Sequence, residues 1–414
     1  MFNKFFADAN KKETISWALF DFANSSYGLL ILSFVFPIFF KEVLAPEATG
    51  DLWWGLAVSL SILIGGLLSP FIGASADHDG RRKKKLVFFT VCSIVGTAFL
   101  YFLGPGMLLI GFILFVLTNI CFEIAQTLYD SFLPHITTPK TAGRISGLGW
   151  GLGYLGGIAA MLLLKPLYES GYIPGMESTY KLTFPLVALF FLITALPTFI
   201  YLKDKEIKKE AYSFLTLCKV AWQKTTKTIK EVKQHKNIAL FLAAFFLLSD
   251  ALVTIFAFVP IYAKTTLGLT MSEIVFIMLI VQLIGFPAVV FFGWLSDHKG
   301  AKKILLVTII LWAIVVIGLA LATNKMMFYA VAILTAFVIG ASQAVARSWY
   351  SKMIPQEKRG EFFGFNGFAN KIAATLGPVM FGIISTVTAN QRIAMASLLI
   401  FLLIAFILFT QVKE

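Results

Sequence analysis

The sequence alternates between long apolar runs and short polar connections over its whole length. Twelve of the runs reach the roughly 20 residues that a helix needs to cross a hydrocarbon core of about 30 Å. They lie near residues 16–41, 54–76, 86–104, 107–131, 143–164, 183–202, 238–263, 272–296, 303–322, 326–350, 361–386 and 391–412. Glycine and proline inside these runs are tolerated in spanning helices, where they allow close packing and kinks. The pattern predicts an all-α membrane protein with 12 transmembrane helices.

One polar connection occurs twice along the chain. Residues 73–85 read GASADHDGRRKKK and residues 293–303 read GWLSDHKGAKK, with Asp77 and Asp297 separated by 220 residues. Because a repeat in the sequence reports a duplicated structural unit, we expect two related halves. The predicted domains are an N-terminal six-helix bundle at 1–202, a basic cytoplasmic linker at 203–236 and a C-terminal six-helix bundle at 237–414.

Composition and charge limit the class of protein. Hydrophobic residues make up 58% of the chain and charged residues 14%, so a soluble domain of this size could not cover itself with polar groups. The net charge of +13 would suit nucleic acid, but 27 of the 35 lysine and arginine residues fall on one side of the predicted membrane. The positive-inside rule then places both termini in the cytoplasm. We expect no nucleic-acid partner, and a monomer in the plasma (bacterial inner) membrane.

The linker at 203–236 allows two interpretations. Leu215, Trp222 and Ile229 recur every seven residues in this basic stretch, which is typical of an amphipathic helix lying along the inner leaflet. A solvated linker with partial helix is the alternative.

Several motifs resemble the major facilitator superfamily of secondary transporters. The pattern G-x-x-x-D-x-x-G-R-R between helices 2 and 3 is similar to the loop motif of that superfamily. Within it, the match is closest to the branch of the vacuolar amino-acid effluxers of autophagy and their bacterial relatives. The residues that carry this match are WALFDFANSSY at 17–27, GRISG at 143–147, GYLGG at 153–157, SQ at 342–343 with ARS at 346–348, EFFG at 361–364 and LGP at 376–378.

The resemblance implies a fold and a mode of transport. The fold would be the major facilitator fold of two pseudo-symmetric six-helix bundles, with helices 1, 4, 7 and 10 lining a central cavity. Transport would proceed by alternating access around a site near the midplane. Helix 4 departs from many drug:proton antiporters of the superfamily, because it carries Glu123 and Gln126 in place of their arginine. That departure weighs against drug efflux.

Charged residues inside the apolar runs indicate a functional site. An ionisable group at bilayer depth costs at least about 2.5–3.5 kcal/mol, so each one needs a partner or a water-filled path. Glu123, Asp250 and Lys371 lie far from the ends of their runs, and Gln126 and Asn370 lie near them in sequence. Two carboxylates and one ammonium leave a negative charge for a proton or a cationic group of the substrate. The alternative is a buried ion pair with Lys371 that only stabilises packing.

A second set of charged residues is predicted at the cytoplasmic ends of the helices. A carboxylate at Asp77 can face the positive N-terminal end of a neighbouring helix, which is worth about 0.3–1 kcal/mol when exposed. The resemblance implies that Asp77 holds the inner ends of the two halves together in the outward-open state. The predicted gate residues are Asp21, Asp77, Arg81, Asp130, Asp297 and Arg347. For the basic run after Asp77, a topology signal alone is the alternative.

These observations predict a secondary active transporter. The expected cargo is a small organic solute, an amino acid or similar metabolite, with protons as the coupling ion. Efflux of amphiphilic compounds and a transporter-like sensor that does not transport remain alternatives. The sequence contains no G-x-x-x-x-G-K-[ST] nucleotide loop, no histidines at metal-ligand spacing and no legible catalytic set. We therefore expect no cofactor, no metal and no enzymatic activity.

Overall fold

The computed structural model describes residues 10–137, 142–204, 223, 226, 231–232, 234–354 and 359–413, and these are helical apart from short connections. The described residues form twelve candidate spans, each a helix or a run of consecutive helical pieces long and apolar enough to cross a membrane, which confirms the predicted number and class. Most of the predicted linker, and with it the amphipathic-helix hypothesis, lies outside the described residues. The elements of the first half are α2 (Lys11–Ser26), η1 (Tyr27–Phe34), α3 (Val35–Phe39), η2 (Phe40–Leu44), α4 (Gly50–Asp79), α5 (Arg82–Phe99), η3 (Leu100–Phe102), α6 (Leu108–Asp130), α7 (Leu133–Ile136), α8 (Ala142–Tyr168) and α9 (Glu177–Tyr201).

The second half contains shorter helical pieces. Its elements are α11 (Lys236–Thr265), α12 (Met271–Lys299), α13 (Ala301–Leu321), α14 (Lys325–Val338), α15 (Ala341–Met353), α16 (Arg359–Ala373), α17 (Leu376–Thr388) and α18 (Gln391–Gln411). The tenth span is α14 followed by α15, and the eleventh is α16 followed by α17. Pro378 explains the second break, because proline has no N–H for a helical bond and is tolerated only in the first turn of a new helix.

The first span is continuous but alternates between α-helical and π-helical segments. It runs from Lys11 to Leu44 and includes two π-helical segments, η1 and η2, on either side of α3. Pro37 lies in α3, where its ring crowds the preceding turn and its missing N–H removes one helical bond. Widened π turns of this kind are frequent at functional sites.

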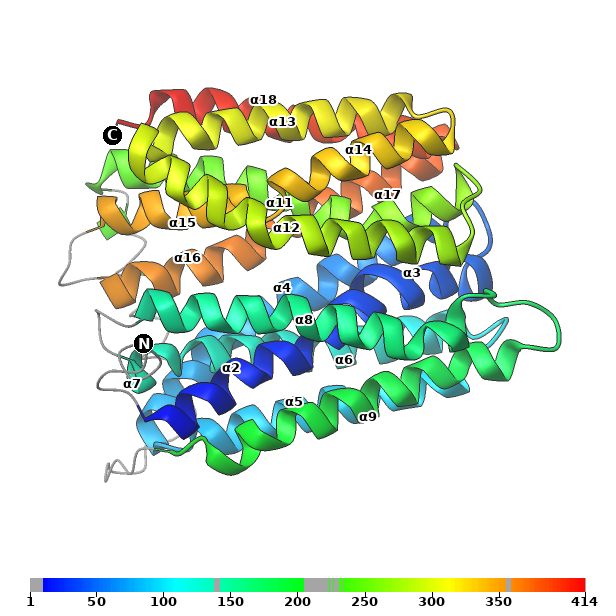
Figure 1. The fold of residues 1–414 in the computed structure, drawn as a ribbon, viewed down its shortest axis with the longest axis horizontal. Coiled ribbons are helices and arrows are strands. Elements are labelled where there is room, and N and C mark those ends of the chain that lie inside the picture. The colour runs from blue at the N-terminus through cyan, green and yellow to red at the C-terminus, as the bar shows by residue number, and fades with distance from the viewer. Residues whose placement is uncertain are drawn as a thin grey trace. The chain divides into compact units, whose positions relative to one another are not determined.

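The chain forms two compact units, and each has its own core. The first unit contains Met1–Phe39 and Ile64–Gln223. In it α2 packs against α8 and α9, and α5 packs against α6 and α9 (Figure 1). Trp17 and Tyr129 stack with ring centroids 4.5 Å apart, and Phe20 stacks on the same tyrosine at 4.9 Å. These aromatic contacts tie α2 to α6.

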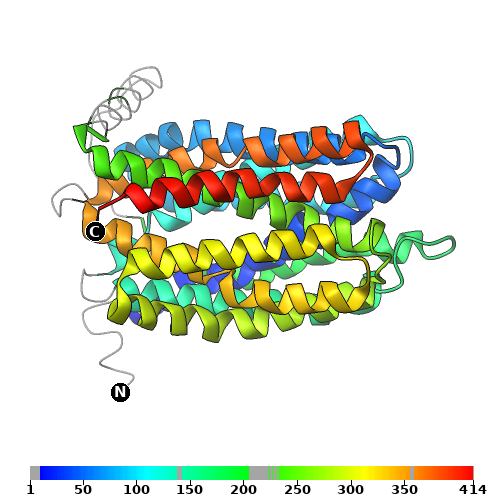
Figure 2. The same cartoon turned by 90° about the horizontal axis from the view of Figure 1, so that it is seen from above.

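The second unit contains Phe40–Leu63 and Lys224–Glu414. Within it α18 packs against α11, α13 and α17, and α12 packs against α14 and α15 (Figure 2). Asn237 at the start of α11 donates to the carbonyl of Lys413 at 2.9 Å and accepts from its N–H at 2.7 Å. The start of α11 and the end of α18 therefore lie at the same end of this unit.

Residues 40–63 belong to the second unit although they precede most of the first unit in sequence. The helix α4 is thus shared, with its first part in the second unit and its remainder in the first. The predicted six-helix bundles at 1–202 and 237–414 divide the chain by its repeat and not by contacts, and they stay a prediction.

Candidate functional site

Asp250 is the most deeply buried charged residue of the predicted midplane site. It lies in α11 with 0% of its surface exposed. Its Oδ1 accepts a hydrogen bond from the N–H of Gly377 at 2.9 Å, and among the described residues nothing donates to its Oδ2. Burying a carboxylate is costly unless both of its oxygens are hydrogen-bonded. The Oδ2 atom is therefore an acceptor that a proton or a bound ligand could satisfy.

The hydrogen-bond donor to Asp250 lies where the eleventh span is broken into α16 and α17. Gly377 lies in the first turn of α17, where backbone N–H groups have no partner inside the helix and the helix dipole is positive. A Cβ atom on Gly377 would come within 2.1 Å of Thr254 Oγ1, so only glycine allows α17 to approach α11 this closely. The local sequence Gly377-Pro378 therefore both starts the helix and presents its N-terminus to the carboxylate.

Helix α16 contributes the other predicted residues of this unit. Asn370 and Lys371 are half-buried, and α16 packs against α11. The Oδ1 atoms of Asn366 and Asn370 are buried, and no described residue donates to them. These two residues are four apart and therefore share one face of α16. That face presents polar acceptors inside the membrane-spanning part of the unit.

In the first unit, Glu123 and Gln126 lie on α6 and are half-buried. A Cβ atom on Gly65 would come within 2.8 Å of Glu123 Cβ, so α4 packs directly against this residue. Gln126 Oε1 accepts a hydrogen bond from Asn24 Nδ2 at 2.9 Å, and Tyr27 donates to Asn119 Oδ1 at 3.2 Å. A row of polar contacts thus connects the first span with α6.

Among the predicted gate residues, Asp21 is part of a packed cluster. Its Oδ2 accepts a hydrogen bond from the hydroxyl of Tyr129 at 2.8 Å. The indole of Trp17 donates to the carbonyl of Tyr129 at 3.0 Å, and a Cβ atom on Gly149 would meet Asp21 Oδ2 at 2.6 Å. Asp21 therefore joins α2 to α6 and α8. Two other predicted gate residues, Asp130 and Arg347, are exposed.

The two copies of the repeated connection differ in their contacts. The side chain of Asp77 lies outside the described part of the structure, although its backbone continues α4. Asp79, which the sequence did not single out, accepts hydrogen bonds from Lys85 at 2.8 Å and from the N–H of Arg81 at 2.9 Å. Burial by itself raises the pKa of the Asp79 carboxyl, but these hydrogen bonds outweigh it and hold the pKa below its usual range.

In the second copy, Asp297 is exposed and pairs with Lys352 at 3.5 Å. It lines a cleft of about 650 Å³ together with His235, Lys236 and Lys352. An exposed ion pair of this kind contributes little to stability, typically about 0–1 kcal/mol, so it is easily broken and remade.

The structure brings Asp250 together with the N-terminus of α17, and Gln126 together with Asn24. Glu123 belongs to the first unit, whereas Asp250, Asn370 and Lys371 belong to the second. That Glu123 and Asp250 face one cavity stays a prediction.

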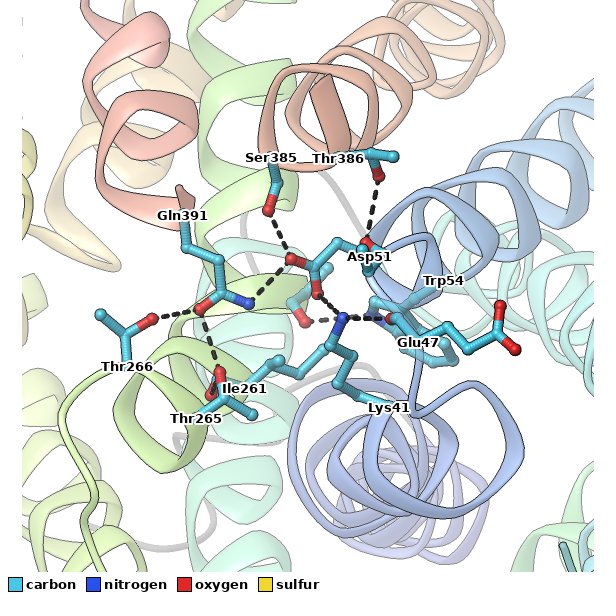
Figure 3. Close-up of polar contacts among 12 residues, drawn as sticks. Lys41, Glu47, Asp51, Trp54, Ile261, Thr265, Thr266, Ser385, Thr386 and Gln391 are labelled. Atoms are coloured by element: carbon cyan, nitrogen blue, oxygen red, sulfur yellow. Dashed lines mark hydrogen bonds and ion pairs between the residues drawn. The ribbon is translucent and has the colours of Figure 1, made fainter. Parts of the chain in front are cut away.

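A buried carboxylate that sequence reasoning missed is Asp51, in the first turn of α4 with 2% of its surface exposed. Its position beside an apolar run resembled an ordinary span end. The two residues that donate hydrogen bonds to it, Ser385 in α17 and Gln391 in α18, are 334 and 340 residues away, so the sequence around Asp51 gives no sign of its burial (Figure 3).

Comparisons with known proteins show the family and the fold of the chain. The profile of the family described as "Vacuole effluxer Atg22 like" matches residues 55–414. The chain belongs to this family. This Atg22-like chain is 28% identical to the uncharacterized MFS-type transporter YxiO of Bacillus subtilis (strain 168) over 412 residues, covering 97% of this chain and 95% of the relative. Autophagy-related protein 22-1 of Penicillium rubens is 23% identical over 411 residues, covering 79% of this chain and 69% of the relative.

Among solved structures, a D-xylose-proton symporter resembles the Atg22-like chain with a TM-score of 0.72 at 15% identity. The match covers 98% of this chain and 97% of the symporter, and at this identity it concerns the fold alone. The expected family and the major facilitator fold are confirmed. The protein is an integral, multi-pass membrane protein and a secondary transporter of the major facilitator type.

Proposed function

We propose that this transporter moves a small zwitterionic solute, an amino acid or similar metabolite, in a proton-coupled cycle in which Asp250 takes up the proton. The observation that carries the proposal is the half-paired state of the Asp250 carboxylate. One oxygen is held by the N–H of Gly377, and the other has no donor among the described residues.

The free oxygen suits either a proton or the ammonium group of a substrate. A buried carboxylate without a counter-ion gains most from neutralisation, because the charged form is poorly solvated there. Protonation also removes the negative charge from the N-terminus of α17, where the helix dipole favours an anion. Proton binding at Asp250 would therefore weaken the hold of α11 on α17, which links the chemistry to a movable half-helix.

The buried acceptors on α16 support a polar solute rather than an amphiphilic one. Among the described residues nothing donates to the Oδ1 atoms of Asn366 and Asn370, which lie in a membrane-spanning helix where an unpaired polar atom is costly. A solute that brings its own N–H donors would satisfy them. The family description names an effluxer, which favours export as the direction.

The sidedness of the transporter is part of the same proposal. Both termini and both copies of the repeated connection would be cytoplasmic, in a plasma membrane, because the basic residues gather there. The predicted gate residues would then act at the cytoplasmic ends of the spans.

The test is transport in liposomes with an internal pH dye, screened with amino acids, peptides and amphiphilic cations. We expect amino acids to induce proton movement, and Asp250→Asn and Glu123→Gln to abolish it while the proteins stay folded. The matched control is Glu169→Gln, which removes one partner of an exposed ion pair with Lys165 (3.3 Å) and leaves transport unchanged. Wild-type rates in both carboxylate variants would contradict the site assignment, and a response to amphiphilic cations alone would contradict the substrate class.

A further inference from the structure

The cluster around Asp51 lies at the ends of the spans that are far from the repeated connection, here called the outer ends. Asp51 Oδ2 accepts hydrogen bonds from the hydroxyl of Ser385 at 2.5 Å and from Nε2 of Gln391 at 2.8 Å. Its Oδ1 lies 3.4 Å from Nζ of Lys41. The buried carboxylate, with 2% exposure, thus has two neutral donors at Oδ2, whereas Oδ1 receives no hydrogen bond from the described residues and is compensated by the ion pair with Lys41. We call these four residues the Asp51 cluster.

The partners of Asp51 are themselves held in place (Figure 3). Gln391 Oε1 accepts from the hydroxyls of Thr265 at 3.0 Å and Thr266 at 2.5 Å, which orients its Nε2 toward the carboxylate. Lys41 Nζ also donates to the carbonyl of Glu47 at 3.2 Å. The network therefore joins η2 and the start of α4 to the end of α11, to α17 and to the start of α18.

Next to the cluster, segment 40–63 packs closely against α11 and α17. A Cβ atom on Gly55 would come within 2.2 Å of the carbonyl oxygen of Pro378, and one on Gly382 within 2.7 Å of Leu52 Cα. The indole of Trp54 donates to the carbonyl of Ala257 at 3.1 Å. Segment 40–63 therefore packs closely against α11 and α17. It is held there by van der Waals contact between backbones, hydrogen bonds and one ion pair, and each of these interactions can break and form again.

The four residues of the Asp51 cluster come from opposite ends of the sequence. Lys41 and Asp51 come from the first two spans, whereas Ser385 and Gln391 come from the last two. Segment 40–63 is built into the second unit, and the rest of α4 continues into the first. A transporter that exposes its site alternately to two sides must release contacts of this kind at one end while closing the other.

We propose that the Asp51 cluster is a latch that fastens the outer ends of the first two spans to the spans formed by α11, α17 and α18, and that it opens once in each transport cycle. The latch is electrostatic, because removing one partner leaves a buried charge without compensation, which costs far more than an exposed pair. It contacts α17 at Ser385, near its C-terminal end, whereas Asp250 contacts Gly377 at its N-terminal end, so this helix of 13 residues is held near both ends by carboxylates.

The latch is tested by the reactivity of a cysteine that it covers. Cys92, Cys121 and Cys218 are first replaced, and Ala257→Cys is introduced, because Ala257 is 3% exposed and its carbonyl accepts the hydrogen bond of the Trp54 indole. The purified full-length protein is treated with a bulky maleimide in detergent, without substrate. We expect Asp51→Asn to raise the labelling rate about tenfold, since an uncompensated Lys41 shifts the equilibrium toward release.

Two comparisons separate a latch from a purely structural role. Gln391→Leu should raise the labelling in the same direction but less, because Lys41 and Ser385 still hold Asp51. Thr308→Cys reports unfolding, since Thr308 is 0% exposed in the core of α13, and its labelling should stay slow in both variants. Glu169→Gln, in an exposed pair, should change nothing.

Unchanged labelling of Ala257→Cys in the Asp51→Asn protein would overturn the proposal. A rise at Ala257→Cys together with an equal rise at Thr308→Cys would also overturn it, because it would mean that Asp51 only supports the fold. Neither outcome depends on the substrate or on proton coupling, so the latch can fail while the proposed function stands.

Discussion

At the scale of single residues, three aspartates of this transporter have different surroundings. Asp250 has one backbone donor at Oδ1, and no described residue donates to its Oδ2. Asp51 is buried but matched by a lysine and two neutral donors. Asp79 is partly exposed and is paired with Lys85. The roles we propose for them, proton uptake at Asp250, a latch at Asp51 and a loop anchor at Asp79, rest on these differences in the number and charge of the donors.

Asp79 allows a prediction on pH and stability. Its pKa is lowered in the folded protein by Lys85 and the N–H of Arg81, so the ionised form stabilises the fold above the usual aspartate pKa of about 3.9. That stabilisation is lost as the pH falls through the lower, folded-state value. We expect Asp79→Asn to melt at a lower temperature than the wild type at pH 6, and the difference to shrink below about pH 4. A difference that stays constant from pH 6 to pH 3 would contradict the assignment.

At the scale of elements, the spans differ in how they depart from a regular helix. The first contains two π-helical segments, and the tenth and eleventh are broken into two helices each. The break in the eleventh produces the helix N-terminus that faces Asp250. Helix packing then depends on small residues, which let backbones approach where lipid gives no hydrophobic driving force.

The contact between α2 and α8 gives a prediction at this scale. A Cβ atom on Gly156 would lie 2.0 Å from the carbonyl oxygen of Phe22, and backbone cannot move aside as a flexible side chain can. We expect Gly156→Ala to destabilise the protein by about 1–3 kcal/mol, seen as a lower melting temperature in detergent.

The matched control is Gly147→Ala on the same helix. An added Cβ atom there meets no atom of the described residues within 4 Å, and alanine is the better helix former by about 1 kcal/mol. Equal melting temperatures for the two variants would mean that α2 and α8 do not need the close approach.

At the scale of the whole molecule, the division into compact units does not follow the order of the chain. Segment 40–63 lies with the second unit, and α4 passes from one unit to the other. The Asp51 cluster and the predicted cytoplasmic gate around Asp77 would therefore act at opposite ends of the same helix. A latch at one end and a gate at the other is the arrangement that alternating access requires.

This arrangement predicts opposite effects for two substitutions on α4. Asp77→Asn weakens the contact expected to hold the outward-open state, so it should lower the labelling of Ala257→Cys below the wild-type rate. Asp51→Asn should raise it, and the double variant should fall between the two because each acts on the same equilibrium. A shift of both single variants in the same direction would contradict the idea of opposed gates.

The sequence by itself determined the class of this protein, the number of spans and the family. Apolar runs of sufficient length can be satisfied in a membrane only as helices, and the repeated motif and the branch-specific residues are local features. Asp250 and Glu123 could be found because a charge inside such a run is costly.

Only the tertiary structure decided which groups meet. The pairing of Asp250 with Gly377 and of Asp51 with Ser385 and Gln391 joins residues far apart in the chain. Asp51 carries no signal in its own neighbourhood, since a charged residue at the start of a span is ordinary. Its burial follows from the close approach of segment 40–63 to α17, which depends on backbone contacts at Gly55 and Gly382 and not on any local pattern.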